Sequence, residues 1–199
     1  DWGSAKPFCV GWYAIAETDW PLVQNMKGER FKLPRGALVR YREYYGCKKD
    51  EDGQEIPDTG LKMTVEEVAD GIISRSRDER YAYTTADPSM FHEDGGPSHA
   101  ERARIKGLIL RPADNTRVPG WDQVRYRLVG DVDPAEEEGW PMIYFMENQP
   151  NIVRTLPALM HDDLKPEDVD SDAEDHPADE LRYACMSRPR TYKLPAAKP

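Results

Sequence analysis

The chain of 199 residues is predicted to form one α/β domain built on a central sheet. Short apolar runs typical of buried strands alternate with stretches whose apolar residues recur at helical spacing. A strand-like run, a helical stretch and a second run follow one another between residues 37 and 86. That succession is typical of a crossover between parallel strands, which places a helix on one face of a sheet.

Two strands are predicted before the crossover helix. Residues 8–16 form a nearly continuous apolar run, as expected of a buried strand, and residues 37–45 alternate, which indicates one wetter face. The connection over 17–36 contains Pro and Gly and has room for one more short strand. Residues 46–60 are strongly polar, and we expect them to form a mobile loop tip.

The crossover helix is predicted over 64–77, where Thr64 and Glu67 form a capping box ahead of apolar residues at helical spacing. A strand over 81–86 follows it and ends at Asp87, directly before a proline. The later elements are, in chain order, a helix over 98–106, a strand over 108–111, a helix over 120–128, a strand over 142–146, a helix over 151–160 and a helix over 177–186.

Two of the later helices carry apolar faces that we expect to point into the core. The residues on these faces are Trp121, Val124 and Leu128 in the first helix, and Ala178, Leu181 and Cys185 in the second. Pro157 should kink or shorten the helix over 151–160. The domain is expected to span residues 1–188, and the Pro-rich residues 189–199 should form an extended tail.

The charge is acidic overall but unevenly distributed. A net charge of -10 argues against a chain that coats nucleic acid by bulk charge. Residues 99–130 nevertheless hold seven Lys or Arg against three acids, whereas residues 131–180 hold two against sixteen. This asymmetry fits a phosphate-binding face beside a metal site, and it fits equally well a solvated helix face beside an acidic loop.

The three cysteines, Cys9, Cys47 and Cys185, show neither a CxxC motif nor an even-numbered framework. Cys9 lies in an apolar run and Cys185 in the apolar stripe of a helix. We therefore expect both to be buried thiols in a reducing compartment. No run approaches the 18 apolar residues of a membrane span.

Carboxylates at the ends of predicted elements are the strongest chemical signal. Asp1 precedes the first strand, Asp87 ends a strand, and Asp175 and Asp179 lie one turn apart on the last helix. Carboxyl ends of strands in α/β sheets commonly bind ligands. Oxygen ligands favour hard divalent ions, and such ions can cut phosphodiesters.

Each carboxylate also has a structural interpretation when taken singly. Asp175 could cap its helix, Asp87 could form an Asx turn, and Asp1 could be a turn residue. The metal-site prediction therefore depends on the acids meeting at one place. A chain that begins at Asp1, without Met and without the strand expected before this acid, is predicted to be a fragment of a longer protein.

The histidines carry a weaker signal. His176 adjoins the acid pair and could orient one of these acids or cap the helix, whereas we expect His92, His99 and His161 to be surface or structural residues. The sequence contains no GxSxG, HExxH or GxxxxGK[ST] motif, so this chain alone offers no P-loop for ATP.

Four stretches together resemble one known family. DWGSAKPF, TADPSMF, LILRPADNTRVPGWDQVRYRL and EDHPADELRYACMSRP resemble the C-terminal nuclease domain of tailed-phage large terminase subunits, over residues 1–188. The resemblance implies an RNase H-like fold shared with RuvC-type resolvases, with a mixed sheet of five strands or slightly more and helices on both faces. It also implies a strand leading into Asp1 and a packaging ATPase upstream.

The implied activity is metal-dependent endonucleolytic cutting of concatemeric genome DNA during packaging. By resemblance, Asp1, Asp87 and Asp179 are the catalytic acids, and Asp175 shares in metal binding. The implied cofactors are two Mg²⁺ or Mn²⁺ ions, one activating the attacking water and the other stabilising the leaving 3′ oxygen. The implied partners are double-stranded DNA, the small terminase subunit and the portal, in the cytoplasm of an infected bacterium.

Two assignments remain open within this interpretation. Some relatives have paired acids where this chain has Asp175 and His176. We expect Asp179 to be the main third acid, because it lies inside the helix and Asp175 lies at its frayed entrance. Arg102, Arg104, Lys106 and Arg117 are weaker candidates for contacts with the DNA backbone.

Two alternatives stay beside the packaging nuclease. The first is a non-catalytic RNase H-like module that docks DNA or a portal protein and uses its acids for structure. The second is a junction resolvase, which would prefer four-way junctions to plain duplex DNA.

Overall fold

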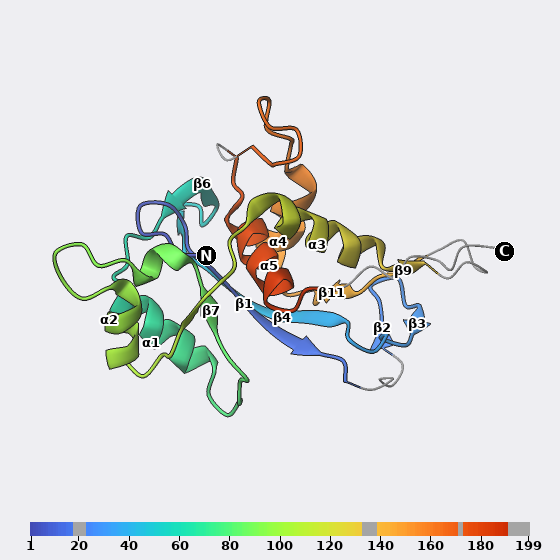
Figure 1. Cartoon of the computed structure of the whole chain (residues 1–199), viewed down its shortest axis with the longest axis horizontal. Helices are drawn as coiled ribbons and strands as arrows, with labels where there is room; N and C mark the ends of the chain where they lie inside the picture. Colours follow the sequence, from blue (N-terminus) through green and yellow to red (C-terminus); the bar gives the residue numbers. More distant parts are fainter. Residues whose placement is uncertain (18–22, 133–138, 171–172, 191–199) are drawn as a thin grey trace.

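The computed structural model describes residues 1–17, 23–132, 139–170 and 173–190 and shows a mixed α/β fold (Figure 1). Its largest sheet has three strands in the order β1 (Cys9–Ile15), β4 (Leu38–Tyr45) and β11 (Ile143–Phe145). β1 runs antiparallel to β4, and β11 runs parallel to β4. The three strands predicted in these regions are confirmed, with bounds that differ by at most one residue at each end.

The remaining predicted strands do not join this sheet in the described part of the chain. β7 (Thr85–Ala86) pairs in parallel only with β8 (Arg111–Pro112), so the prediction of one continuous sheet is wrong. The chain passes from β7 to β8 through the 3-10 turn η1 (Pro88–Phe91) and helix α2 (His99–Ile105). The parallel crossover therefore surrounds α2, and not the helix that begins at Thr64.

The helix predicted at the capping box is α1 (Val65–Arg75). The Thr64 hydroxyl accepts from the Glu67 backbone N–H, and the Glu67 carboxylate accepts from the Thr64 N–H, which completes the box. A second box, formed by Ser98 and Glu101, starts α2 in the same way, although the sequence analysis did not use it. The two helices pack together over a small core that consists of Val65, Ala69, Ala86, Met90 and Ala103.

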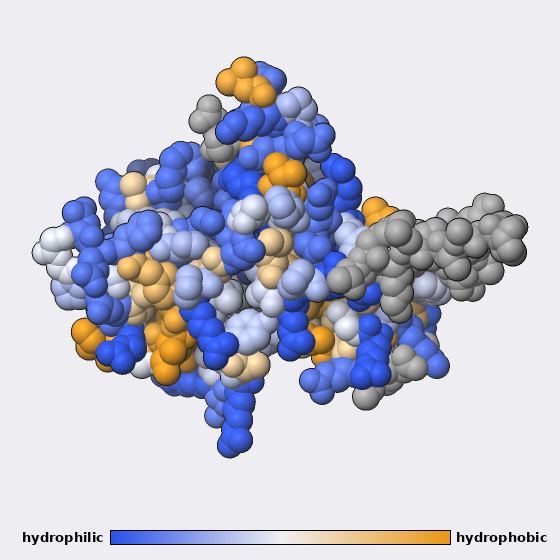
Figure 2. Space-filling view, in the orientation of Figure 1, coloured by the Kyte–Doolittle hydropathy of each residue, from blue (hydrophilic) through white to orange (hydrophobic). Residues whose placement is uncertain are grey.

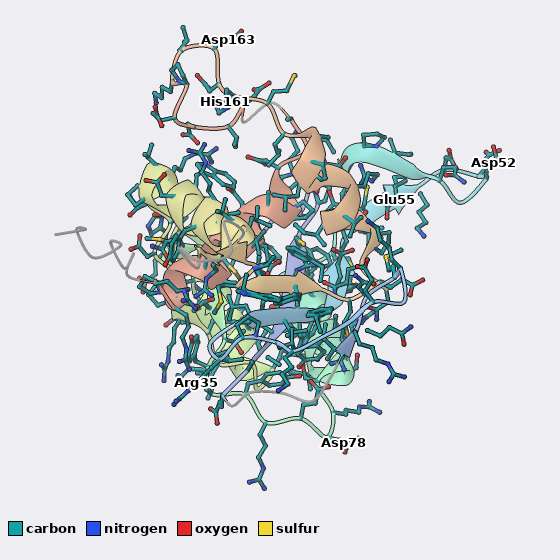
Figure 3. All side chains as sticks on the ribbon, turned by 90° about the vertical axis from the view of Figure 1, so that its right-hand side faces the viewer. Arg35, Asp52, Glu55, Asp78, His161 and Asp163 are labelled. Atoms are coloured by element: carbon teal, nitrogen blue, oxygen red, sulfur yellow. The ribbon has the colours of Figure 1, made fainter. Side chains whose placement is uncertain are left out.

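The polar stretch over 46–60 is a hairpin rather than a structureless tip. β5 (Cys47–Lys49) pairs antiparallel with β6 (Glu55–Gly60). The Asp50 carboxylate accepts from the backbone N–H groups of Asp52 and Gln54 and so closes the turn. Figure 3 shows Asp52 at its outer end. A second short hairpin, β2 (Val23–Gln24) with β3 (Arg30–Phe31), provides the extra strand expected within 17–36, and residues 18–22 lie outside the described ranges.

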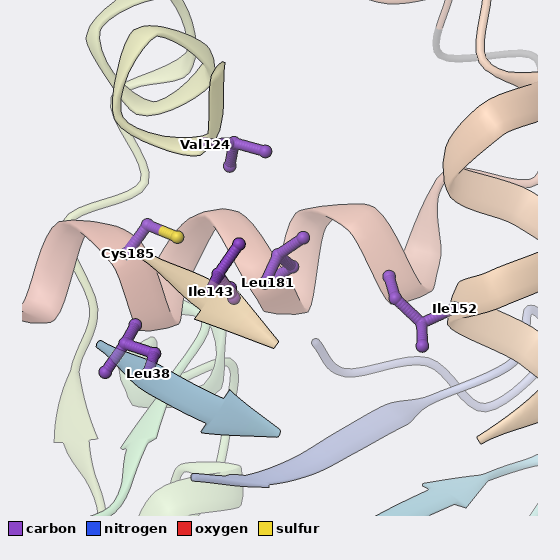
Figure 4. Packing of buried hydrophobic residues seen from close by; sticks show 6 residues of the cluster. All are labelled: Leu38, Val124, Ile143, Ile152, Leu181 and Cys185. Atoms are coloured by element: carbon purple, nitrogen blue, oxygen red, sulfur yellow. The ribbon is translucent and has the colours of Figure 1, made fainter. Parts of the chain in front are cut away.

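Three later helices cover one face of the large sheet (Figure 1): α3 (Arg117–Val129), α4 (Pro150–Thr155) and α5 (His176–Ser187). Their shared core with the sheet consists of Leu38, Val124, Ile143, Ile152, Leu181 and Cys185 (Figure 4). α4 passes into the 3-10 turn η2 (Leu156–Ala158), as expected from Pro157. A short hairpin of β9 (Asp131–Val132) and β10 (Gly139–Trp140) follows α3.

The predicted inward face of α3 is partly wrong. Val124 is buried, but Leu128 is 41% exposed, and the neighbouring Arg127 is buried instead. The Arg127 guanidinium donates to the backbone carbonyls of Met142 and Arg188. These bonds connect α3 to the segment before β11 and to the segment after α5. All three cysteines are free and buried, which confirms that Cys9 and Cys185 are buried thiols.

Much of the surface is polar, with apolar side chains gathered at the lower left of Figure 2, over α1 and α2. Ile73, Ile105 and Ile109 are exposed in this part of the molecule. None of the helices in the described ranges combines the length and the apolar character that a bilayer crossing requires.

Candidate functional site

The N-terminal half of α5 is the centre of the candidate site. The helix begins after Asp175 and has Pro177 within its first turn, a position that suits proline because no backbone donor is needed there. Asp175 is 7% exposed, and its carbonyl accepts from the N–H groups of Ala178 and Asp179. Asp175 thus lies at the helix entrance as expected, but it is buried and its carbonyl closes the first turn, so the expectation of a frayed entrance is wrong.

His176 connects this helix start to Asp1. Its Nδ1 lies 3.0 Å from Asp1 Oδ2, and its Nε2 lies 3.1 Å from Asp58 Oδ1 on β6. Burial lowers the pKa of His176. A neutral imidazole has one N–H and therefore donates to only one of these two carboxylates. His176 thus orients Asp1 or Asp58, and Lys6 also pairs with Asp58.

Asp87 reaches the same helix from β7. One carboxylate oxygen accepts from the Ser89 backbone N–H at 2.7 Å, which is the Asx turn considered from the sequence. The other oxygen accepts from the Tyr183 hydroxyl of α5 at 2.6 Å. Burial raises the pKa of Asp87, but the hydrogen bonds from Ser89 and Tyr183 outweigh it and keep the pKa below its usual value. Asp87 is therefore an ionised carboxylate held beside α5.

Two arginines approach the acids of α5. Arg117, on α3, bonds both oxygens of Asp168 at 2.8 Å and places its Nη atoms 3.5 Å from Asp179 and 3.9 Å from Asp175. Arg182 Nε donates to Asp179 at 3.1 Å. Among the described residues, Asp179 consequently has two cationic neighbours, whereas Asp175 has only the longer contact with Arg117 and a 4.0 Å approach to His176.

The electrostatic balance at Asp175 is unfavourable for a carboxylate. Burial, and then the neighbouring charge of Asp179, raise the pKa of Asp175 to about 6. A buried carboxylate whose negative charge is incompletely compensated would gain from an additional cation. This observation matches the chemistry of the donor set, in which carboxylate oxygens favour hard divalent ions.

Asp1 and Asp87 thus each contact α5, at His176 and Tyr183, and Asp175 and Asp179 belong to the first part of the same helix. Within residues 1–17, 23–132, 139–170 and 173–190, however, no group of three or more His, Cys, Asp or Glu side chains is arranged to hold a metal ion. The residue types fit a hard divalent cation, and the side-chain positions do not already form a closed ligand set.

A buried ionic cluster fixes α5 on the sheet below the acids. Arg40 of β4 is fully buried and donates to Glu180 of α5 from Nε at 3.1 Å and from Nη2 at 2.9 Å. Its Nη1 donates to Glu43 at 2.8 Å and to Gln149 at 2.7 Å. The Tyr13 hydroxyl also donates to Glu180. These buried bonds fix the position of α5 on the sheet, and with it the positions of Asp175 and Asp179.

The predicted DNA-contacting residues are separated from one another. Arg102 pairs with Glu66 and Lys106 pairs with Asp70, so both join α2 to α1. Arg104 is exposed on α2. Arg117, by contrast, lies among the acids and not on an outer basic face.

The other histidines lie apart from the acids in the manner expected. His92 and His161 are exposed, and Figure 3 shows His161 on the outlying loop that also carries Asp163. His99 packs edge-to-face against Trp2.

Three participants were missed by the sequence analysis: Asp58, Tyr183 and the buried partner role of Arg182. Asp58 lies in a stretch that looked like a loop tip. Tyr183 and Arg182 lie outside the predicted core face of Ala178, Leu181 and Cys185, yet both are buried. The available signal was the polar groups of Arg182 and Tyr183 in the stretch HPADELRY, because polar side chains that are buried require hydrogen-bond partners.

No family model, curated protein or solved structure matches the chain.

Proposed function

We propose that this chain is a metal-dependent endodeoxyribonuclease, the nuclease part of a phage packaging terminase. The observation that supports the proposal is that Asp1 and Asp87 both contact α5, the helix that begins with Asp175 and carries Asp179. These acids come from three separate parts of the chain, and hydrogen bonds through His176 and Tyr183 link two of them to the helix. Burying several negative charges close together costs free energy unless cations compensate them. Such clusters are common at functional sites.

The roles follow from the surroundings of each acid. Asp1, Asp87 and Asp179 would hold Mg²⁺ or Mn²⁺, and Asp175 would strengthen the binding because its own charge lacks a close partner. When bound, the ions supply an activated water and neutralise charge on the scissile phosphate. Tyr183 keeps Asp87 ionised and oriented, and His176 would orient Asp1 in the tautomer that carries its proton on Nδ1. Arg117 would provide a cationic contact for a phosphate that approaches the acids.

The proposed fold class is RNase H-like. The mixed sheet, the parallel β7–β8 pair and the helix α5 support it, because they supply strands of both directions and a helix that contacts both β1 and β7. The proposed partners are double-stranded DNA, an upstream packaging ATPase, the small terminase subunit and the portal, in the cytoplasm of an infected bacterium.

A second candidate function has a specific observation in its favour. Asp179 already pairs with Arg182 and approaches Arg117, and Asp87 forms an Asx turn, so both acids have structural roles without any metal. These contacts are what a non-catalytic module for docking DNA or a portal protein would show.

Nicking of supercoiled plasmid in Mn²⁺ separates the two functions. We expect the wild-type chain and the control Asp94→Asn to nick, because Asp94 is exposed and lies outside the set of candidate acids. Asp87→Asn should lose the activity while its thermal melting stays unchanged, and EDTA should stop cutting by every variant. Cutting by Asp87→Asn at the wild-type rate would reject the assigned site. A strong preference for four-way junctions over linear duplex would indicate a resolvase instead.

A further inference from the structure

His176 holds both of its ring nitrogens against carboxylates. Nδ1 lies 3.0 Å from Asp1 Oδ2, and Nε2 lies 3.1 Å from Asp58 Oδ1. The side chain is only 15% exposed, and the fully buried Pro177 follows it in the chain, so the ring has little freedom to turn away. The imidazole is therefore fixed between two acids from distant parts of the sequence.

A neutral imidazole cannot donate to both of these acids. It carries one N–H, and its second nitrogen presents a lone pair. In either tautomer, one of the two contacts brings this lone pair against an anionic oxygen, and that contact is repulsive unless a cation lies beside the two atoms. The tautomer that donates from Nδ1 orients Asp1. The tautomer that donates from Nε2 bonds to Asp58 and leaves the Nδ1 lone pair beside Asp1.

The charges at the two ends of the ring differ. Asp58 already has a cation, because Lys6 pairs with its second carboxylate oxygen. At the other end, Nδ1 faces Asp1 and also lies 4.0 Å from Asp175 Oδ1. Two carboxylates therefore surround Nδ1, whereas the carboxylate at Nε2 is paired. An added cation gains more at the Nδ1 end.

The spacing between Nδ1 and Asp1 suits two ligands of one ion. Neighbouring ligands of an octahedral ion at about 2.1 Å are separated from each other by about 3 Å. Nδ1 and Asp1 Oδ2 are 3.0 Å apart. A nitrogen among oxygen ligands suits Mg²⁺ poorly, and it suits first-row transition ions such as Mn²⁺ better.

The Nε2 end has the arrangement typical of histidines that bind metals. Such a histidine donates its other ring N–H to a carboxylate or a carbonyl, which fixes the tautomer. Asp58 lies in that place. Its backbone has a φ of 54°, in the left-handed region that favours glycine. A residue with a long polar side chain at such a position indicates that the side chain has a use there.

We propose that His176 binds the metal ion through Nδ1, next to Asp1, and that Asp58 is the positioning residue that keeps the proton of the ring on Nε2. The ion replaces the Nδ1 proton of the other tautomer, and that proton moves to Nε2, so the ring stays neutral. The proposal rests on the metal site of the proposed function and names the ligand that makes this site prefer Mn²⁺ to Mg²⁺.

Pulsed electron paramagnetic resonance of Mn²⁺ bound to the chain tests the ligand. A nitrogen that binds Mn²⁺ modulates the electron spin echo, and oxygen ligands do not produce this modulation. We expect nitrogen modulation in the wild-type chain and in the control His161→Gln, because His161 is exposed. We expect none in His176→Asp, which replaces the nitrogen ligand with a carboxylate oxygen and should still bind Mn²⁺.

Calorimetric titrations with Mn²⁺ and Mg²⁺ test the ion preference and the role of Asp58. The ratio of Mn²⁺ affinity to Mg²⁺ affinity should fall in His176→Asp by about tenfold. Asp58→Gly removes the carboxylate and suits the positive φ, so it should fold, but it should weaken Mn²⁺ binding by about 10–100-fold. The matched control is Asp52→Gly, at the outer end of the same hairpin (Figure 3), and it should bind Mn²⁺ like the wild type.

Three results would overturn the proposal. They are Mn²⁺ bound to the wild-type chain without nitrogen modulation, equal modulation in His176→Asp, and unchanged Mn²⁺ affinity in Asp58→Gly. A wild-type chain that binds no Mn²⁺ would overturn both this proposal and the nuclease. Nicking of plasmid in Mn²⁺ without nitrogen modulation would reject the role of His176 and leave the nuclease intact. Nitrogen modulation in a chain that never nicks would do the reverse.

Discussion

Replacing Arg40 with methionine should destabilise the protein more than any surface charge change. The Arg40 side chain is fully buried, and its partner carboxylates are 8% exposed in Glu180 and 4% exposed in Glu43. Methionine fills much of the same space but removes every donor. Glu180 would then keep only the Tyr13 hydroxyl, while Glu43 would keep the N–H groups of Asn151 and Ile152.

The magnitude follows mainly from Glu180. Removing one partner of a buried ion pair typically costs about 3–5 kcal/mol, because the other charge stays buried without compensation. Glu43 retains the N–H groups of Asn151 and Ile152 as donors, so it should add little to the loss of stability. We therefore expect a loss of about 3–5 kcal/mol, which is a large part of the 5–15 kcal/mol that holds a typical domain together.

Urea unfolding followed by tryptophan fluorescence measures this loss. The matched control is Arg42→Met, two residues along β4, whose ion pair with Glu79 is about 30% exposed on both sides. Partly exposed pairs contribute about 0–1 kcal/mol, so the control should lose little. Equal losses in the two variants, or a loss below about 1 kcal/mol for Arg40→Met, would refute the argument that this cluster fixes α5 on the sheet.

Three further predictions use the same approach. Gly11→Ala should cost about 1–3 kcal/mol in urea unfolding, since a Cβ there would lie 2.5 Å from Glu180 Oε1; an unchanged midpoint would show that the cluster yields easily. Hydrogen bonds from Arg42 hold the pKa of Glu79 at about 2, against an ordinary 4.5, so its contribution to stability is present above pH 4.5 and is lost as the pH falls toward 2. Glu79→Gln should flatten the stability-versus-pH curve in that window, and an identical curve would contradict the assignment. In Mn²⁺ titrations of plasmid nicking, Asp179→Asn should lose most of the cutting and Asp175→Asn should mainly require more Mn²⁺; the opposite ranking would make Asp175 the main acid.

The elements with strong local signals could be predicted from the sequence. The capping box at Thr64 gave the start of α1, the apolar run gave β1, and the spacing of Ala178, Leu181 and Cys185 gave the core face of α5. In each case the local pattern and the tertiary packing agree.

Predictions failed where tertiary partners decide the outcome. The stretch over 46–60 has a loop composition, but the Asp50 side chain closes a turn and makes a hairpin. Leu128 faces solvent because the buried Arg127 finds backbone carbonyls to bond. The prediction of a single sheet failed because only two residues of the stretch 81–86, Thr85 and Ala86, form strand pairs, and they pair with β8.

The candidate site also has features that could be predicted from the sequence and features that could not. Asp87 and the one-turn spacing of Asp175 and Asp179 could be read from element ends and helical periodicity. Their partners could not, because Tyr183 and His176 reach Asp87 and Asp1 across sequence separations of 96 and 175 residues. Local sequence patterns do not predict contacts between residues so far apart in the chain.

Calorimetric titration of Mn²⁺ tests the central claim most directly, because it asks whether acids from separate parts of the chain form one ion site. We predict that the wild-type chain and Asp94→Asn bind Mn²⁺ alike. Asp1→Asn and Asp87→Asn should each lose most of that binding, although these residues lie 86 positions apart in the sequence. Undiminished Mn²⁺ binding by either variant, with the fold intact by circular dichroism, would contradict the account.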